Sequence, residues 1–205
     1  MIKEIRAFNF EVRAEGDEES GRYLTGRPIV YDIPADLGWY TEIISRGALD
    51  DTDLRDVPFF VNHNTDMIPL ARSRNNNANS TMQMVIDDDG MGIRVLLDVE
   101  SNADARSLYS AVERGDISGM SFMFAVDRDR WDDVDSDHPT RHIERIARVY
   151  EVSAVTWPAY TATSITARGL TDALESARAS LDSVRAKMAQ VERQKRKIKI
   201  IMEVI

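Results

Sequence analysis

The sequence contains no cysteine, little proline or glycine, and no long apolar run. Of its 205 residues, 6 are proline and 10 are glycine. The absence of cysteine excludes disulfides, thiolate catalysis and cysteine metal sites, and it permits a reducing compartment. No segment approaches the roughly 18 apolar residues of a membrane-spanning helix, and residues 1–6 predict a strand rather than a signal peptide. We therefore expect a protein that does not associate with membranes.

Basic residues are also scarce in most of the chain. The net charge is −9 overall. Residues 166–205 hold nine Lys/Arg and five Asp/Glu, and residues 1–165 hold 17 and 30, so the two parts carry +4 and −13. A strongly acidic body opposes binding to phosphate backbones, which makes nucleic acid an unlikely partner for it. The basic C-terminal part is a separate region with its own properties.

What is present is an ordinary globular composition, with 43% hydrophobic and 30% charged residues. It suits one domain plus an appendage. The segment Asp87–Gly90 joins two apolar alternations and predicts a β-hairpin. The spacing of apolar residues in 102–114 predicts a helix that Ser101 or Asp104 caps and that ends at Gly115. We expect residues 14–21 to form an acidic loop, and residues 127–142 to form a charged surface excursion within a hairpin.

The C-terminal part differs in kind. From Leu170 onward, apolar residues recur with a seven-residue period, in two lines. This repeat predicts a coiled-coil helix, with Lys195 interrupting one line. We place the boundary near residues 160–169, which gives a domain of residues 1–165 and a helical tail of residues 166–205. The tail is expected either to join a helix of another protein or to pack in a homodimer.

A serine at the start of an apolar strand is the leading candidate nucleophile. After Gly115, a tight turn leads into a strand in which Ser121 shares one face with Met123, while Phe122 and Phe124 face the other way. Ser118 is a weaker candidate. The alternative reading is that Ser121 is simply a polar residue of the strand.

Two other residues complete a hydrolytic set. His63 lies between two asparagines after an apolar run and is suited to act as a general base, because imidazole titrates near neutrality. Glu151 interrupts an apolar strand and needs a partner if it is buried. Serine, histidine and a carboxylate form a triad if the fold brings them together. The alternatives are a surface histidine at a strand end and an exposed glutamate on a half-buried strand.

The remaining histidines, His138 and His142, flank a charged loop and are expected to be surface residues. With His63 they show no spacing typical of a metal site. The chain also lacks a glycine-rich phosphate loop.

Several short motifs in order resemble one known family. The chain is similar to the phage prohead (capsid maturation) proteases, serine peptidases that share their fold with the herpesvirus assemblins. The resemblance covers about residues 1–165 and is carried by the segments Arg46-Gly47-Ala48-Leu49, Val61-Asn62-His63-Asn64, Pro69-Leu70-Ala71-Arg72, Asp88-Asp89-Gly90-Met91, Gly115-Asp116-Ile117-Ser118-Gly119-Met120-Ser121-Phe122, Glu151-Val152-Ser153-Ala154-Val155 and Pro158-Ala159.

The resemblance implies an α+β fold, mainly an antiparallel β-barrel of the assemblin type with a few helices and the C-terminal helix. It implies a serine peptidase with Ser121 as nucleophile, His63 as general base and Glu151 as the third member. No cofactor or metal is implied. The implied substrates are the scaffold protein or the scaffold-like segment of the major capsid protein, and the protease itself, inside the assembling procapsid in the host cytoplasm.

A competing hypothesis is a protein that has the same fold but no catalytic activity. Such a chain would serve as a capsid scaffolding or assembly module, and the intact serine, histidine and carboxylate argue against it. A third possibility is a nucleic-acid-binding accessory that uses the basic tail, for which salt-dependent DNA binding would be the evidence.

Overall fold

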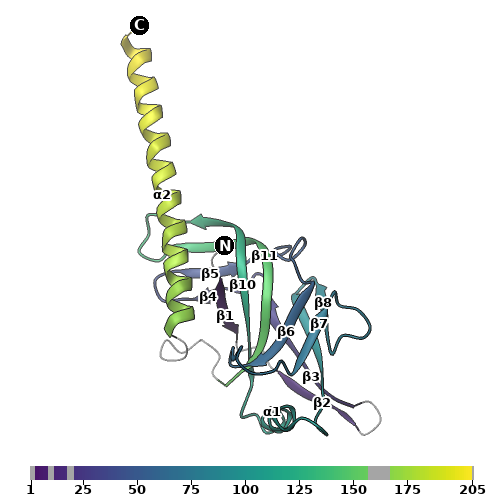
Figure 1. Cartoon of the computed structure of the whole chain (residues 1–205). Coiled ribbons are helices and arrows are strands. Elements are labelled where there is room, and N and C mark those ends of the chain that lie inside the picture. The colour runs from purple at the N-terminus through teal and green to yellow at the C-terminus, as the bar shows by residue number, and fades with distance from the viewer. Residues whose placement is uncertain (1–2, 9–11, 18–20, 157–166, 205) are drawn as a thin grey trace.

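A computed structural model describes residues 3–8, 12–17, 21–156 and 167–204 of the chain. The described residues form eleven strands and two helices, in two sheets. Figure 1 shows the sheets forming one body, with a long C-terminal helix that runs along one side and continues beyond it. The expected boundary at residue 165 lies outside the described residues.

The larger sheet is built around a long antiparallel pair, β10 and β11. The edge strand β1 pairs with β10, whereas β11 pairs in parallel with both β5 and β6 at different places along its length. The short strands β4 and β7 complete the sheet. Its members are β1 (Glu4–Phe8), β4 (Ala35–Asp36), β5 (Thr41–Ile44), β6 (Asp56–Val61), β7 (Ala71–Arg74), β10 (Gly119–Asp132) and β11 (Thr140–Val155).

The expected barrel is not confirmed, because the described strands do not close on themselves. β11 is 16 residues long, and its pairing with β10 contains four register shifts. Such irregularities bend a strand. The first part of β11 lies beside β5 and its last part beside β6. The sheet therefore branches and keeps free edges, and the α+β class holds without closure.

The second sheet has the order β2-β3-β9-β8. The predicted hairpin at Asp87–Gly90 is confirmed, since β8 ends at Asp87 and β9 begins at Gly90. The acidic loop expected over residues 14–21 is wrong in its first part, because Arg13–Asp17 is a strand paired with β3. The members are β2 (Arg13–Asp17), β3 (Gly21–Val30), β8 (Met82–Asp87) and β9 (Gly90–Leu97).

One apolar core joins both sheets and the first helix. Helix α1 (Ala103–Glu113) buries Ala105, Leu108 and Val112, as its spacing predicted. Its N-cap is Asn102, whose side chain accepts from the backbone N–H groups of residues 104 and 105, so neither Ser101 nor Asp104 is the cap. An asparagine is as good a cap as aspartate or serine, which is why the sequence alone misplaced it.

The charged segment 127–142 lies in a hairpin, as expected, but most of it is strand rather than a surface excursion. β10 continues to Asp132 and β11 begins at Thr140, with Arg130 opposite His142. Ion pairs across the two strands satisfy the charges, among them Arg128 with Glu144 at 3.0 Å. When both faces of a strand are solvated or ion-paired, its sequence does not alternate between apolar and polar residues. Such a sequence therefore resembles a loop.

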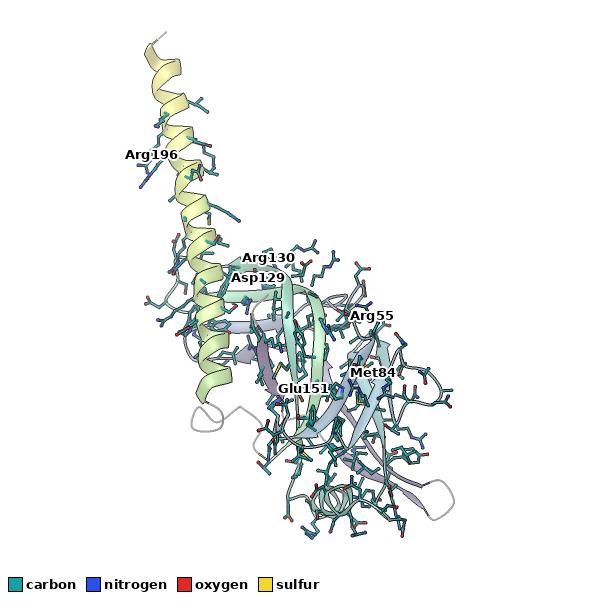
Figure 2. All side chains as sticks on the ribbon, in the orientation of Figure 1. Arg55, Met84, Asp129, Arg130, Glu151 and Arg196 are labelled. Carbon is teal, nitrogen blue, oxygen red and sulfur yellow. The ribbon has the colours of Figure 1, made fainter. Side chains whose placement is uncertain are left out.

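Helix α2 (Ala167–Val204) packs on the body along part of its length. Ala177 and Leu181 are buried against Tyr40 and Trp131, with Leu174 and Val184 partly buried beside them. The apolar residues in the first part of the heptad repeat therefore pack on the body of the same chain. The side chains of Met188, Val191 and Ile198 are 51%, 47% and 58% exposed, and Figure 2 shows Arg196 on the part of α2 beyond the body.

Polar contacts add to this docking. The Ser180 hydroxyl donates to Asp129 Oδ2 at 2.9 Å and accepts from Trp131 Nε1 at 3.1 Å. The Ser176 hydroxyl donates to Glu4 Oε1 at 3.2 Å. In Figure 2, Asp129 lies beside α2, whereas Glu151 lies lower in the sheet. Within the described part of the chain, neither helix is long and apolar enough to cross a membrane.

An ion cluster beneath α2 ties β1 to β5 and β11. Arg6 and Arg141 bind Glu4 and Glu42, and all four side chains are at most 4% exposed. Burial opposes ionisation of Glu4, but the charges of Arg6 and Arg141 prevail and hold the pKa of this carboxyl below its ordinary value. The cluster therefore links the N-terminal strand to β5 and β11 through buried ion pairs.

Candidate active site

Neighbouring strands bring the serine, the glutamate and the histidine together. Ser121 on β10 lies directly opposite Ser153 on β11, and Glu151 lies two residues before Ser153. Because side chains alternate along a strand, Ser121, Ser153 and Glu151 share one face of the sheet. Ala154 pairs with Val61 at the end of β6, which places His63 just beyond that strand end and beside the same face.

The three predicted residues form a continuous hydrogen-bonded line. Glu151 Oε1 lies 2.5 Å from His63 Nδ1, and His63 Nε2 lies 2.6 Å from Ser121 Oγ. The side chains of His63 and Glu151 are 10% and 3% exposed. This is the geometry that a nucleophile, a base and an orienting carboxylate require. The sequence therefore identified three residues that the fold places in contact.

The backbone around the histidine is held in an unusual conformation. Asn62 and His63 have φ of 50° and 57°, in the left-handed region. The Asn62 N–H donates to Ala154 O at 2.9 Å, and the Asn62 side-chain oxygen accepts from the Thr156 N–H at 3.1 Å. Asparagine tolerates this region better than most residues, and the two bonds to the end of β11 fix the turn that aims the imidazole.

One buried serine in the site was not singled out by the sequence. Ser153 is 0% exposed, and its hydroxyl donates to Glu151 Oε2 at 2.6 Å. The Ser153 Oγ atom also accepts a hydrogen bond from the His63 backbone N–H at 3.2 Å. The spacing of Glu151 and Ser153, with one residue between them on a strand, was the available signal, since it places both on the same face.

A backbone carbonyl from the N-terminal strand also contacts Ser121. The Ser121 hydroxyl donates to Arg6 O at 2.7 Å, and Ser121 is 0% exposed. No side-chain pattern marks a backbone carbonyl, so sequence reasoning had no means of finding it. Because Ser121 Oγ is enclosed in this state, a substrate carbonyl reaches it only after neighbouring groups move.

The other candidates lie elsewhere. Ser118 is exposed and precedes β10. His138 Nε2 lies 3.0 Å from Thr41 Oγ1, and His142 Nε2 lies 3.0 Å from Asp132 Oδ2. Neither histidine contacts His63. Among the residues that the structure describes, no cluster of His, Asp and Glu is arranged to hold a metal ion.

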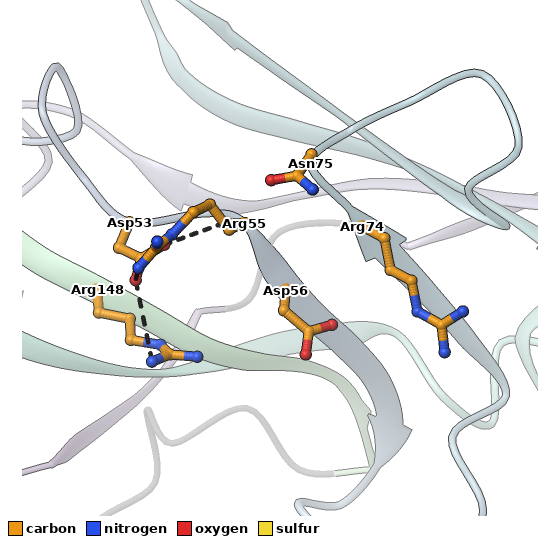
Figure 3. Close-up of a pocket in the computed structure, with 6 residues that line it drawn as sticks. All are labelled: Asp53, Arg55, Asp56, Arg74, Asn75 and Arg148. Carbon is orange, nitrogen blue, oxygen red and sulfur yellow. Dashed lines mark hydrogen bonds and ion pairs between the residues drawn. The ribbon is translucent and has the colours of Figure 1, made fainter.

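A charged hollow of about 370 Å³ lies at the other end of β6 (Figure 3). It is lined by Asp53, Arg55, Asp56, Arg74, Asn75 and Arg148. Hydrogen bonds from Arg55 hold the pKa of Asp53 well below its ordinary value, and Arg72 lowers that of Asp56 in the same way. Both carboxylates are thus already paired with guanidinium groups, and the hollow lacks a nucleophile.

Comparison with known proteins agrees with the chemistry of this site. A hydroxyl, an imidazole and a carboxylate in contact are the functional groups of a serine hydrolase. The family described as Caudovirus prohead serine protease matches residues 8–176, and the chain belongs to that family. It is accordingly a member of a serine peptidase family of tailed phages.

A solved structure, that of the bacteriophage T4 capsid assembly protease gp21, is also similar. It matches at 11% sequence identity with a TM-score of 0.36, over 75% of this chain and 99% of that one. A likeness this weak carries no argument about the chain. No curated protein matches the sequence.

Proposed function

We propose that this protein is a serine endopeptidase of phage capsid maturation, with Ser121 as nucleophile, His63 as general base and Glu151 as its orienting acid. The observation that carries the proposal is the line from Glu151 Oε1 through both imidazole nitrogens to Ser121 Oγ, at 2.5 and 2.6 Å. Membership in the prohead serine protease family supports the class of reaction.

The geometry suits acyl transfer through a covalent intermediate. Ser121 Oγ attacks the peptide carbonyl carbon while His63 Nε2 takes the hydroxyl proton. The imidazolium then returns that proton to the leaving amine, and water hydrolyses the acyl-enzyme by the same route. Glu151 accepts from Nδ1–H, which leaves Nε2 free to act as the base and stabilises the cation as it forms.

The serine proton has two acceptors in the resting state. His63 Nε2 and Arg6 O lie 2.6 and 2.7 Å from Ser121 Oγ. A hydroxyl carries a single proton, so a neutral imidazole and the carbonyl compete for it. Activation in this mechanism requires the proton to point to Nε2 and the enclosed hydroxyl to become accessible to substrate.

The substrates that we propose are the capsid scaffold protein or the scaffold-like segment of the major capsid protein, together with the protease itself. The support is the family, whose members are prohead proteases. Cleavage would then take place inside the assembling procapsid in the host. No metal or cofactor enters the mechanism.

The distal part of α2 is proposed to bring the protease to that substrate. Residues 186–199 contain six basic residues and one acidic residue, and their apolar positions Met188, Val191 and Ile198 are exposed. Like charges oppose a parallel dimer of this segment, whereas an acidic amphipathic helix of the scaffold complements it. Deleting residues 186–205 should therefore prevent packaging in procapsids and leave peptidase activity intact. Normal packaging of the truncated protein, or a dimer that depends on this segment, would contradict the assignment.

The first test of the peptidase uses a small serine-reactive reagent. Diisopropyl fluorophosphate should add one diisopropylphosphoryl group with loss of fluoride, located at Ser121 by peptide mapping, and Ser121→Ala should not react. Glu151→Gln should slow the reaction by up to about 10⁴-fold. Co-expression with the major capsid protein should give discrete fragments with the wild type alone. An unreactive Ser121 and uncleaved capsid protein would instead indicate a catalytically silent assembly module of the same fold.

A further inference from the structure

We infer that Ser153 is a positioning residue of the active site, which holds Glu151 and the His63 backbone in the arrangement that the reaction needs. The inference rests on the proposed function of Ser121, His63 and Glu151. It starts from a hydroxyl that makes two buried hydrogen bonds within the site and none elsewhere among the described residues.

The first bond fixes the carboxylate. Ser153 Oγ donates to Glu151 Oε2 at 2.6 Å, while Oε1 faces His63 Nδ1 at 2.5 Å. Each carboxylate oxygen therefore has its own partner. A glutamate side chain has three rotatable bonds. The hydrogen bond from Ser153 restricts their rotation and keeps the carboxylate facing the imidazole. Fixing both oxygens defines the plane in which Nδ1–H is accepted.

The second bond fixes the histidine from its backbone. The His63 N–H donates to Ser153 Oγ at 3.2 Å, and His63 lies in the left-handed region with φ of 57°. A β-carbon disfavours this region, so the turn depends on the contacts that hold it. One hydroxyl thus anchors the base and its carboxylate to the same point on β11.

The position of Ser153 in the sheet makes this anchor rigid. It lies opposite Ser121 in the β10–β11 pair and opposite Phe60 in the β11–β6 pair. It therefore occupies a central strand with neighbours on both sides and is 0% exposed. Ser153 therefore lies where β10, β11 and β6 run side by side, and these strands position Ser121, Glu151 and His63.

Loss of the hydroxyl should affect catalysis more than folding. Ser153→Ala removes one donor to a buried carboxylate and the acceptor of one backbone N–H. Outer partners that orient the ligands of metal sites typically contribute about 10- to 100-fold to activity, and we expect a loss of similar size in the rate at which the reagent phosphorylates Ser121. Ser153→Cys keeps the size and retains only a weak donor, so its rate should lie between those of wild type and Ser153→Ala.

A pH profile separates positioning from a general structural effect. Within the described residues, the ionisable side chains of this hydrogen-bonded network are His63 and Glu151, and the other groups are hydroxyls and backbone. Without the Ser153 donor, the Glu151 carboxylate is no longer held against Nδ1–H and stabilises the imidazolium less, so the acid limb of the rate profile should move to lower pH. A change in packing alone would lower the rate and leave the limb in place.

The experiment compares the rates of Ser121 phosphorylation by diisopropyl fluorophosphate from pH 5 to 9 for the wild type, Ser153→Ala and Ser153→Cys. Ser73→Ala is the matched control, because Ser73 is also 0% exposed on a strand and its hydroxyl has no partner among the described groups. Ser73→Ala should leave both the rate and the profile unchanged. If the wild type reacts and Ser153→Ala matches it in rate and acid limb, this inference is wrong while the proposed triad stands. If wild-type Ser121 does not react and co-expressed capsid protein also stays uncleaved, the proposed function itself is wrong.

Discussion

The buried ion cluster offers the sharpest test of how β1 is held in the larger sheet. Arg141 is 2% exposed and contacts Glu4 at 2.8 Å, Glu42 at 3.1 Å and Asp129 at 2.7 Å. Arg6 is its only guanidinium neighbour among the described residues of the cluster. Replacing Arg141 with methionine leaves three carboxylates around one arginine, so buried negative charge is no longer balanced.

Breaking a buried ion pair by removing one partner destabilises proteins by about 3–5 kcal/mol. In a domain of this size each kcal/mol lowers Tm by about 2–4 °C, which predicts a drop of roughly 6–20 °C for Arg141→Met. Thermal and urea unfolding followed by circular dichroism would measure it. The urea m-value should stay unchanged, because the same surface is exposed on unfolding.

A surface pair serves as the matched control. Arg27 binds Asp87 through two hydrogen bonds of 2.6 and 2.7 Å, but the two side chains are 32% and 41% exposed. Arg27→Met should cost under about 1 kcal/mol, because water screens an exposed pair. Adding Glu4→Gln to Arg141→Met should restore part of the lost stability, since it removes one unbalanced charge. Equal costs for Arg141→Met and Arg27→Met would refute the reasoning.

Three further predictions concern pH, the β8–β9 hairpin and the docked helix. Folding lowers the pKa of Glu4 below its ordinary value of 4.5. Its contribution to stability is therefore complete above about pH 4.5 and is lost as the pH falls through the lower pKa of the folded state. Unfolding free energies measured from pH 7 to 3 should show this loss, and Glu4→Gln should weaken it. Gly90→Ala should prevent stable folding, because its β-carbon would lie 2.1 Å from a β3 carbonyl oxygen, whereas Gly115→Ala, with open space around it, should cost only about 1 kcal/mol in urea unfolding. Removing residues 167–205 should shift tryptophan emission to longer wavelength, since Trp131 is 6% exposed beneath α2; an unchanged spectrum would contradict the docking.

Local signals in the sequence predicted part of the local structure, and they selected three residues that the fold brings into contact. The Asp87–Gly90 turn and the apolar spacing of residues 102–114 were sufficient to place a hairpin and a helix. His63, Ser121 and Glu151 each stood out as a polar residue beside an apolar run. Their contact depends on strand pairing between residues far apart in the chain, and only the order of motifs shared with a known family pointed to it.

The parts that were missed depend on contacts that no local pattern encodes. Ion pairs between neighbouring strands stabilise the charged ends of β10 and β11, so their composition resembled a loop. The barrel did not form because β11 pairs with two different strands along its length. The heptad repeat was real, but Ala177 and Leu181 pack on Tyr40 and Trp131 rather than on a second helix. A repeat identifies an apolar stripe and leaves its partner undetermined.

The division of α2 into a docked and a projecting part also sets a mechanical scale. The helix has 38 residues and, at a rise of about 1.5 Å per residue, measures about 57 Å. Among the described side chains of α2, the last that hydrogen-bonds to the body is Arg185, whose Nε donates to Val134 O at 2.7 Å, and the helix continues for about 28 Å past that residue. A flexible linker would let the active site take many positions around the point where the protein is bound. A rigid helix bound at its distal end instead holds the active site at one distance and in one direction. The position on α2 at which a partner binds would therefore decide which peptide bonds the active site can reach.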